Sequence, residues 1–415
     1  MKLLIIGSGA REHALVWKLA QECEVFASPG NPGIAAECNT FDIQAHNHQG
    51  IRDLATKLEA DLVLVGPEDP LIQGLADALR NHQIPVFGPG GHGALLEGSK
   101  AFAKALMREA AIPTADYQVF TDPGDALEYA VGRFKDGKQV AVKASGAALG
   151  KGVFVCDSPE AAEEAIEMML LHDELGEAGR TVVIEDRIDG KEFSLLTLCS
   201  NGSYRSLPVA QDYKRVFDGD RGPNTGGMGT YSPVPWVNSA LVEETEVRVV
   251  EPILNLMAKK GIDYRGVLFS GLMLQDDTPY CLEFNVRFGD PETQTIMMRL
   301  GGGFAEALRA VAAGETVPPF EVLDRAAVSV VLASDGYPGD YRKGYPIRFA
   351  HAPEHLKVFH AGTAERGGEI VTNGGRVLTL SAVGDTLEDA RSRAYGAVEF
   401  VSFPGMHYRL DIASV

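Results

Sequence analysis

Residues 279–294, PYCLEFNVRFGDPETQ, constrain the fold of this chain more than any other stretch. With the two-residue period of a β-strand, one face carries apolar residues for the core: Leu282, Phe284, Val286 and Phe288. The opposite face carries residues able to do chemistry: Cys281, Glu283, Asn285 and Arg287. The glycine, aspartate and proline that follow predict a sharp turn and a helix starting near Thr293.

The polar face of this strand suits a metal-bound polyphosphate. Oxygens two residues apart on a strand are separated by roughly 7 Å, so Glu283 and Asn285 can both reach divalent cations bound to phosphates. Mg²⁺ prefers such ligands and keeps its other positions for water and substrate. Arg287 adds a planar fork for a phosphate or carboxylate. An amphipathic strand with solvated polar residues is the alternative, and a phosphate-type loop upstream counts against it.

Length, charge and cysteine usage limit the class of protein. A chain of 415 residues predicts about two to four domains. The formal charge of −19, without a basic block, argues against nucleic-acid binding. Five scattered cysteines argue against a zinc site or a disulfide framework. Since no apolar run approaches the roughly 20 residues that cross a bilayer, we expect a soluble cytoplasmic protein with no membrane partner.

Strands and helices alternate through the first 88 residues, which predicts an open parallel sheet with ligands beyond the carboxyl ends of its strands. The expected strands are residues 2–6, 24–27, 61–65 and 85–88, and the expected helices are residues 14–20, 51–58 and 71–81. The turn at residues 7–9, before a helix, is an anion site. Since it lacks the third glycine of a dinucleotide motif, a phosphosugar fits it better than a redox cofactor.

A second glycine-rich loop, residues 145–152, lies between predicted strands and has Lys143 and Lys151 at its ends. It is not a Walker A motif, since no GK[ST] opens a helix. Such a loop either folds over phosphates or is a simple hairpin turn; Glu283 and Asn285 favour phosphates. The strand ending at Glu185 offers backbone groups to a purine edge.

Later segments carry fewer signals. Residues 221–230 predict an irregular loop close to substrate, and residues 241–260 predict one long helix. Beyond residue 303 we expect a small α+β domain that covers a site without supplying catalysts. Its predicted strands are residues 326–333, 347–350, 358–361 and 376–382, and its helix is residues 387–401.

Over essentially its whole length the chain resembles the phosphoribosylamine–glycine ligase family of the ATP-grasp superfamily. The resemblance rests on GSGAREHALVWK, LVGPEDPL, LEGSKAF, KASGAALGKG, QDYKRVFDGDRGPNTGGMGTYSP and LEFNVRFGDPETQ. It implies an α/β and α+β multidomain fold. The implied domains are an N-terminal parallel-sheet domain (1–100), an ATP-grasp core (101–120 and 191–320), a small lid (121–190) and a C-terminal α+β domain (321–415).

The resemblance also implies roles for individual residues, with Arg287, Asp212 and Lys143 in catalysis. ATP would be bound by Lys100, Lys143, Ser145, Gly146, Gly150, Lys151, Gly152, Glu185, Asp186, Ile188 and Glu192. Mg²⁺ or Mn²⁺ would be held by Glu283 and Asn285. Glycine and 5-phosphoribosylamine would lie at Gly9, Arg11, Glu12, Gly66, Pro67, Glu68, Asp212, Gly226, Gly227, Met228, Gly229, Arg287, Asp290, Pro291 and Glu292. The chain departs from the family pattern at Ala10, Ser145, Ala147, Leu149 and Tyr213.

The implied reaction is an ATP-dependent step of purine biosynthesis. Glycine's carboxylate attacks the γ-phosphate to give glycyl phosphate, and the amine of phosphoribosylamine then displaces phosphate. A ligase with a different acceptor and a non-catalytic nucleotide sensor are the alternatives. The sensor could dispense with Glu283, Asn285 and Arg287. A monomer or weak homodimer is expected.

Overall fold

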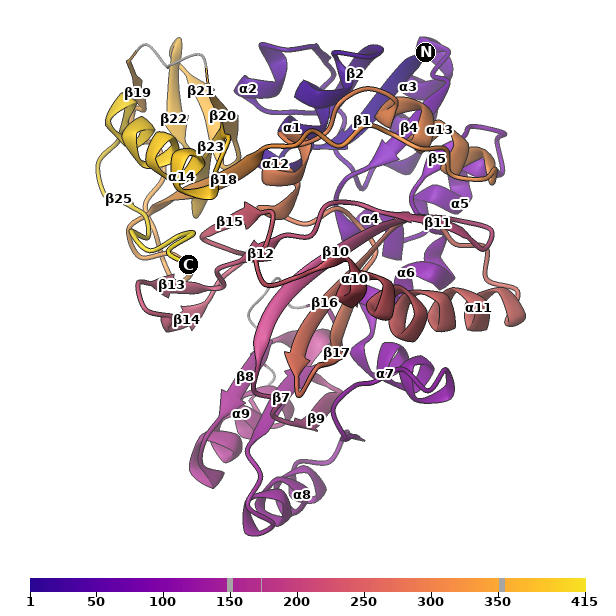
Figure 1. The fold of residues 1–415 in the computed structure, drawn as a ribbon, viewed down its shortest axis with the longest axis vertical. Coiled ribbons are helices and arrows are strands. Elements are labelled where there is room, and N and C mark those ends of the chain that lie inside the picture. Colours follow the sequence, from indigo (N-terminus) through magenta and orange to yellow (C-terminus); the bar gives the residue numbers. More distant parts are fainter. Residues whose placement is uncertain (148–151, 173, 351–354) are drawn as a thin grey trace.

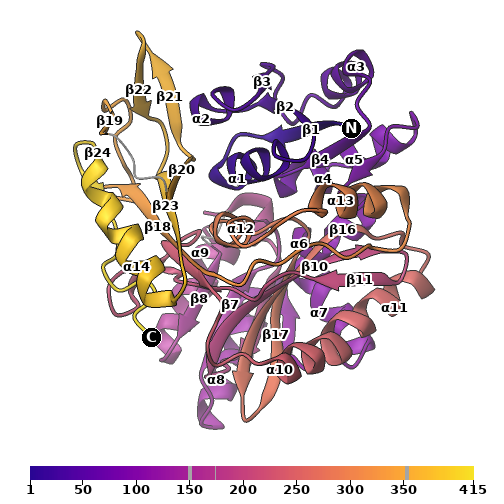
Figure 2. The same ribbon diagram turned by 45° about the horizontal axis from the view of Figure 1, so that its top comes forward.

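The computed structural model describes residues 1–147, 152–172, 174–350 and 355–415. Within these ranges, four sheets of four or more strands are accompanied by three two-stranded ribbons. In Figure 1 the N-terminal sheet lies at the upper right and the C-terminal sheet at the upper left, with a central antiparallel sheet below them and a small sheet at the bottom. Figure 2 shows the same arrangement from a second direction. The expected multidomain α/β architecture is confirmed.

The N-terminal sheet is parallel throughout, in the order β3-β2-β1-β4-β5. Its strands are β1 (Lys2–Gly7), β2 (Glu24–Pro29), β3 (Asn39–Thr40), β4 (Leu62–Val65) and β5 (Val86–Phe87). Its helices are α1 (Ala10–Leu19), α2 (Pro32–Ala35), α3 (His48–Leu58), α4 (Glu68–Ile72), α5 (Leu75–Arg80) and α6 (Gly91–Gly98). The single helix predicted at residues 71–81 is wrong: Gly74, with φ of 85°, separates α4 from α5.

The N-terminal sheet and the central sheet share their apolar cores. Leu4 packs in one cluster with Phe193 and Leu268, whereas its neighbour Leu3 packs in a second cluster with Leu196. Because both faces of the parallel sheet are buried, its strands are continuous apolar runs. Close packing therefore fixes the position of one sheet relative to the other.

The central sheet is antiparallel, in the order β11-β10-β16-β17, with β10 (Lys191–Ser200), β11 (Ser203–Ser206), β16 (Arg265–Gln275) and β17 (Thr278–Asn285). A β-bulge at Leu282 shifts the register of β17 against β16. Cys281 is therefore buried in the core, and Leu282 lines the cavity described below. The prediction that Cys281 shares the polar face is wrong. The strand also ends at Asn285, before Arg287, which lies in the following turn.

Helices cover the central sheet. Residues 241–260 are helical as predicted, but a π-type turn interrupts the regular helix, giving α10 (Ser239–Thr245), the turn Glu246–Val250 and α11 (Glu251–Lys259). Pro252 lacks the N–H that would donate to the carbonyl of Arg248, which favours a wider turn at this point. Among the described residues, no helix is long and apolar enough to cross a bilayer.

The small sheet has its own apolar core. Its order is β6-β9-β7-β8, formed by β6 (Tyr117–Phe120), β7 (Val140–Ala144), β8 (Val153–Cys156) and β9 (Val182–Asp186). Two helices pack on it, α8 (Pro123–Lys135) and α9 (Pro159–Leu170). Ala130, Val142, Ile166 and Ile184 belong to a cluster separate from the cores of the larger sheets. The chain enters this unit through a connector that follows α7 (Lys100–Glu109).

The C-terminal sheet includes strands from the middle of the chain. It is built from β12 (Gln211–Asp212), β15 (Gly229–Ser232), β18 (Ala326–Ser334), β20 (Leu356–His360), β23 (Arg376–Gly384) and β25 (Met406–His407). The irregular loop predicted at residues 221–230 is therefore wrong in part, since Arg221–Asn224 is β14, paired with β13 (Arg215–Phe217). Other elements here are α12 (Glu292–Met297), α13 (Phe304–Ala313), β19 (Arg348–Phe349), β21 (Thr363–Arg366), β22 (Glu369–Thr372), α14 (Leu387–Gly396) and β24 (Val401–Ser402).

Candidate active site

A cavity of about 1220 Å³ lies where the four sheets meet. Its walls come from the small sheet, β17, the helices after β1 and β4, and the C-terminal sheet. Sixteen of the predicted site residues line it: Arg11, Glu68, Lys100, Lys143, Gly152, Glu185, Asp186, Ile188, Glu192, Asp212, Gly226, Glu283, Asn285, Arg287, Asp290 and Glu292. The fold therefore brings together side chains that are distant in the sequence.

At one end of the cavity, Glu185 pairs with two lysines. Its Oε2 lies 2.5 Å from Nζ of Lys104, and its Oε1 contacts Nζ of Lys143. Burial acts to raise the pKa of Glu185, but the two ammonium groups outweigh it and lower that pKa. Lys100 lies close enough to Lys143 and Glu283 for both charges to act on its pKa. This cluster of cations can bind a polyphosphate.

Apolar side chains flank the lysine cluster. The small sheet supplies Ala141, Val153, Val155 and Val183, and β17 supplies Leu282 and Phe284. A slot with apolar walls and a few polar groups suits a flat ring such as a purine. The carboxylate of Asp186 is already paired, since it accepts hydrogen bonds from Arg133 Nε at 2.7 Å and Lys138 Nζ at 2.6 Å.

Ser145 joins the small sheet to the helix that carries Lys100. Its carbonyl accepts a hydrogen bond of 2.7 Å from the Lys100 amide, and its hydroxyl accepts one of 3.1 Å from the Ala101 amide. This contact keeps Lys100 beside the end of β7. Of the phosphate loop, Leu149, Gly150 and Lys151 lie outside the described residues.

Carboxylates gather around Lys214 in the centre of the cavity. Its Nζ lies 3.0 Å from Oε2 of Glu192. Burial acts to lower the pKa of Lys214, but Glu192, Asp212 and Glu283 raise it well above its usual value. Burial also raises the pKa of Asp212, and burial together with the charge of Asp212 raises the pKa of Glu292 to about 8. A cationic group bound beside Asp212 and Glu292 would favour their ionised forms.

Glu283 and Asn285 fit a divalent cation. In the part of the chain that the structure describes, no hydrogen bond or ion pair engages the carboxylate of Glu283. Although burial acts to raise its pKa, Lys214, Lys143 and Lys100 lower it, so the group is ionised. An ionised carboxylate beside an amide oxygen is a donor set that Mg²⁺ and Mn²⁺ accept. The described residues hold no cluster of three His, Cys, Asp or Glu ligands, so phosphates and water would supply the remaining donors.

Arg287 connects the turn after β17 to the helices beside the N-terminal sheet. Its Nη2 lies 2.9 Å from Oε1 of Glu97, and its Nε lies 3.4 Å from Oε2 of Glu68. Glu68 also lies 3.9 Å from Arg11. Burial raises the pKa of Glu97 to about 7 despite the opposing charge of Arg287. The two arginines and two carboxylates form a chain of charges from Asn285 to the N-terminal helices.

The glycine turn of the N-terminal sheet is filled by Glu12. Its Oε2 accepts a hydrogen bond of 2.7 Å from the Gly9 amide, and its Oε1 accepts one of 2.6 Å from Nε of Arg11. A Cβ on Gly66 would lie 2.1 Å from Glu12 Oε1, so only glycine fits there. The Gly9 amide is therefore not free for an anion, and Arg11 is the cation of this turn that lines the cavity.

Arg376 links the glycine segment at residues 226–229 to the turn after β17. Its Nη1 donates hydrogen bonds of 2.6 Å to the carbonyls of both Gly226 and Asp290. Gly227 has φ of 112°, and a Cβ there would lie 2.4 Å from Cδ of Pro291. The C-terminal part of the chain thus contributes the Arg376 side chain to the wall of the cavity.

Ten predicted residues do not line the cavity within the described ranges. Met228 is buried against Val216 and Ala333, and Gly229 pairs with Val330 in the C-terminal sheet. The ten are Gly9, Glu12, Gly66, Pro67, Ser145, Gly146, Gly227, Met228, Gly229 and Pro291.

Several lining residues were missed from the sequence, among them Glu97, Lys104, Lys214, Leu282 and Arg376. Lys104 follows Lys100 by one helical turn, so the i,i+4 spacing could have indicated it. Leu282 enters the cavity through a bulge that no local pattern predicts, and Arg376 arrives from a strand without any motif.

Three family models match consecutive parts of the chain. The N domain of phosphoribosylglycinamide synthetase matches residues 1–97, its ATP-grasp (A) domain matches residues 98–293, and its C domain matches residues 327–415. The lysine cluster at Glu185 and the strand that carries Glu283 and Asn285 lie within the ATP-grasp match. Fold and site together define an ATP-grasp ligase.

Relatives identify the family within this class. Phosphoribosylamine–glycine ligases of Rhizobium meliloti and Rhodopirellula baltica are 46% and 44% identical, each over 99% of this chain and over 98% and 97% of their own lengths. The crystal structure of phosphoribosylamine–glycine ligase from Thermotoga maritima has a TM-score of 0.87 at 37% identity, covering 99% of this chain and all of that one. The chain belongs to the phosphoribosylamine–glycine ligase family.

A more distant structure shares the fold alone. The biotin carboxylase domain of Hydrogenobacter thermophilus 2-oxoglutarate carboxylase, solved with ADP and magnesium, has a TM-score of 0.76 at 19% identity over 98% of this chain and 91% of that one.

The raised pKa of Glu292 predicts a pH-dependent stability difference. Between its usual value of about 4.3 and about 8, the folded chain retains a proton that the unfolded chain has released, so this group's contribution to stability falls as the pH rises. We expect Glu292→Gln to gain stability relative to wild type from pH 5 to pH 8.5, measured by urea unfolding without ligands. The exposed Glu306→Gln is the control. A Glu292→Gln difference that does not change with pH would contradict the assignment.

Proposed function

We propose that this chain joins glycine to 5-phosphoribosylamine with ATP, through glycyl phosphate, giving glycinamide ribonucleotide, ADP and phosphate. One observation carries the proposal: a single cavity runs from the lysines of the small sheet, past Glu283, Asn285 and Arg287, to Arg11 and Glu68 beside the N-terminal sheet. We infer the substrates from the family, and each of them can be assigned to a part of the cavity.

The nucleotide is assigned to the end formed by the small sheet. Its ring would lie between the apolar side chains of β7, β8 and β17, with its edge toward the backbone near Ile188. Lys100 and Lys143 would meet the phosphates. Mg²⁺ or Mn²⁺, held by Glu283 and Asn285, would neutralise charge on the phosphates during transfer.

Glycine is assigned to the centre of the cavity. Its carboxylate would face Arg287, whose guanidinium offers a planar pair of donors. Its ammonium group would face Asp212 and Glu292. Burial raises the pKa of both groups, and a cation beside them would favour their ionised forms. This orientation would direct a carboxylate oxygen at the γ-phosphate, since Arg287 and the lysines assigned to the phosphates line the same cavity.

The first bond formed joins a glycine oxygen to the γ-phosphorus, and the bond between that phosphorus and the bridging oxygen of ADP breaks. The amine of phosphoribosylamine then attacks the acyl carbon, phosphate leaves with the glycine oxygen, and the amine releases a proton. The residues named here supply positioning and charge stabilisation, so no serine or cysteine nucleophile is required.

A ligase assay tests the proposal. ADP release should require both glycine and phosphoribosylamine generated in the cuvette, with glycinamide ribonucleotide as the product. ADP release that does not respond to glycine would refute the substrate assignment, and a response to a different amine would favour another ligase. Nucleotide binding without turnover would favour a nucleotide sensor.

Glu283→Gln tests the metal assignment. The amide keeps the shape of the side chain but removes its charge, so we expect about 10- to 100-fold more Mg²⁺ for half-maximal turnover. The measurement is turnover against Mg²⁺ concentration, with the exposed Glu388→Gln of α14 as the control. A Mg²⁺ dependence equal to wild type would remove Glu283 from the metal site.

Arg11→Gln tests the placement of the sugar phosphate. Losing a charge-assisted hydrogen bond of about 1.5–3 kcal/mol should raise the KM for phosphoribosylamine by about 10- to 100-fold and leave the KM for ATP within about twofold. Arg52→Gln, on α3 outside the cavity, is the matched control. Equal changes in both KM values would indicate a general structural defect instead.

A further inference from the structure

The pairing of Glu185 with two lysines raises a question about how Lys143 can bind a nucleotide. Without ligand, Lys143 is engaged by the carboxylate of Glu185, and both side chains are buried. A lysine held this way must leave its partner before it can contact a phosphate. Leaving a buried carboxylate without any cation is strongly unfavourable, so a second cation at Glu185 decides whether the exchange is possible.

Lys104 is that second cation, and its position is fixed. Its Nζ lies 2.5 Å from Oε2 of Glu185 and donates a hydrogen bond of 2.6 Å to Oγ1 of Thr114. The Thr114 hydroxyl in turn donates to the carbonyl of Cys281 at 2.6 Å. Lys104 is 3% exposed, so its side chain is enclosed by partners on both sides.

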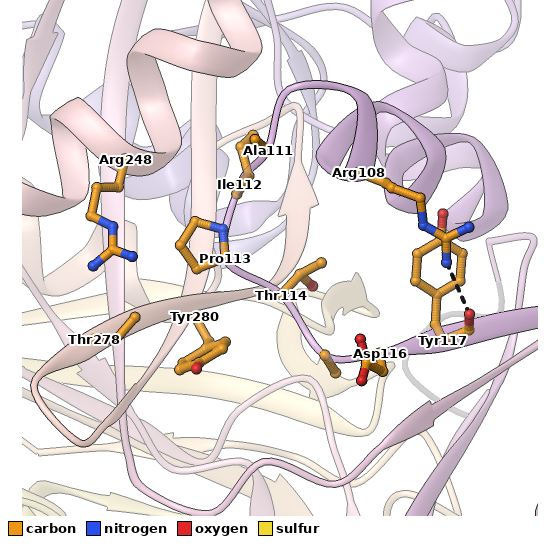
Figure 3. A pocket seen from close by; sticks show the side chains of 11 residues that line it. Arg108, Ala111, Ile112, Pro113, Thr114, Asp116, Tyr117, Arg248, Thr278 and Tyr280 are labelled. Atoms are coloured by element: carbon orange, nitrogen blue, oxygen red, sulfur yellow. Dashed lines mark hydrogen bonds between the residues drawn. The ribbon is translucent and has the colours of Figure 1, made fainter.

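Thr114 belongs to the connector between α7 and the small sheet, and this connector is anchored. The Cys281 amide donates a hydrogen bond of 2.8 Å to the carbonyl of Pro113. Figure 3 shows the connector with Pro113 and Thr114 beside Tyr280, and with Arg108 stacked on the ring of Tyr117. The connector therefore holds Lys104 relative to β17, whereas Glu185 and Lys143 lie on neighbouring strands of the small sheet.

We propose that Lys104 is a positioning residue that keeps Glu185 paired and in place, so that Lys143 can exchange Glu185 for a phosphate of the nucleotide. This inference rests on the proposed function, which gives the cavity a nucleotide. Lys104 need not touch the nucleotide itself. It acts by holding the carboxylate of Glu185, on the small sheet, to helix α7.

The charges on the three groups agree with this role. Burial acts to raise the pKa of Glu185, and the two lysines lower it. Burial lowers the pKa of Lys104, whereas in Lys143 the carboxylates of Glu185 and Glu283 outweigh burial and raise the pKa. Lys143 is thus strongly held as an ammonium group, and a phosphate can replace the carboxylate only where the carboxylate has another partner.

Binding of ADP and of adenosine to the full chain, measured by calorimetry, tests the inference. We expect Lys104→Met to weaken ADP binding by about tenfold or more and to change adenosine binding by less than about twofold, because only the phosphate contact of Lys143 is lost. Lys104→Met/Glu185→Gln should bind ADP within about threefold of Glu185→Gln alone, since neutralising the carboxylate releases Lys143. The control is Lys18→Met, which removes an equally buried lysine paired with Glu22 outside the cavity.

Several outcomes would overturn the inference. Unchanged ADP binding by Lys104→Met, an equal loss of ADP and adenosine binding, or a double variant weaker than Lys104→Met would each exclude the exchange. If Lys104→Met does not fold, Thr114→Val decides, with an expected loss of ADP binding of about threefold and no change for adenosine; no loss would contradict the role. Wild-type protein that binds neither compound would refute the proposed function instead.

Discussion

The site depends on the guanidinium of Arg287, which lies in the turn after β17. It pairs with Glu97 at the end of α6 and with Glu68 at the start of α4, both at the carboxyl edge of the N-terminal sheet. Two ion pairs therefore hold the acidic strand of the ATP-grasp unit against the unit assigned to the sugar phosphate. Because all three side chains are largely buried, removing the guanidinium would leave two carboxylates without a partner, which proteins tolerate poorly.

Charge is balanced locally in this cavity. The chain carries a formal charge of −19, so long-range attraction does not favour anionic substrates. Instead, cations lie beside carboxylates in the cavity: Lys143 beside Glu185, Lys214 beside Glu192, and Arg287 beside Glu68. Each anionic substrate group can replace a carboxylate at a cation that is already in place. This exchange differs from the creation of a new buried charge, and its energetic penalty is smaller.

Much of the fold could be predicted from local patterns, whereas most of the site residues came from the resemblance to the family. Alternating strands and helices predicted the parallel sheet, and a two-residue period placed Glu283 and Asn285 on a strand facing the cavity. Features that depend on pairing partners could not be predicted. The bulge that buries Cys281 depends on the register against β16, and Arg376 reaches the cavity only because β23 joins a sheet that includes β15. The contacts that tie Lys104 to Glu185 likewise join segments far apart in the sequence.

The most direct test of the account follows oxygen atoms from glycine. We propose that the glycine carboxylate binds between Arg287 and the nucleotide phosphates, so one carboxylate oxygen should bridge the acyl carbon and phosphorus in the intermediate. With glycine labelled by ¹⁸O in both carboxylate oxygens, one labelled oxygen should appear in inorganic phosphate and the other should remain in the amide of the product. Phosphate free of the label in the presence of product would contradict the account, because the carboxylate would not have attacked the γ-phosphate.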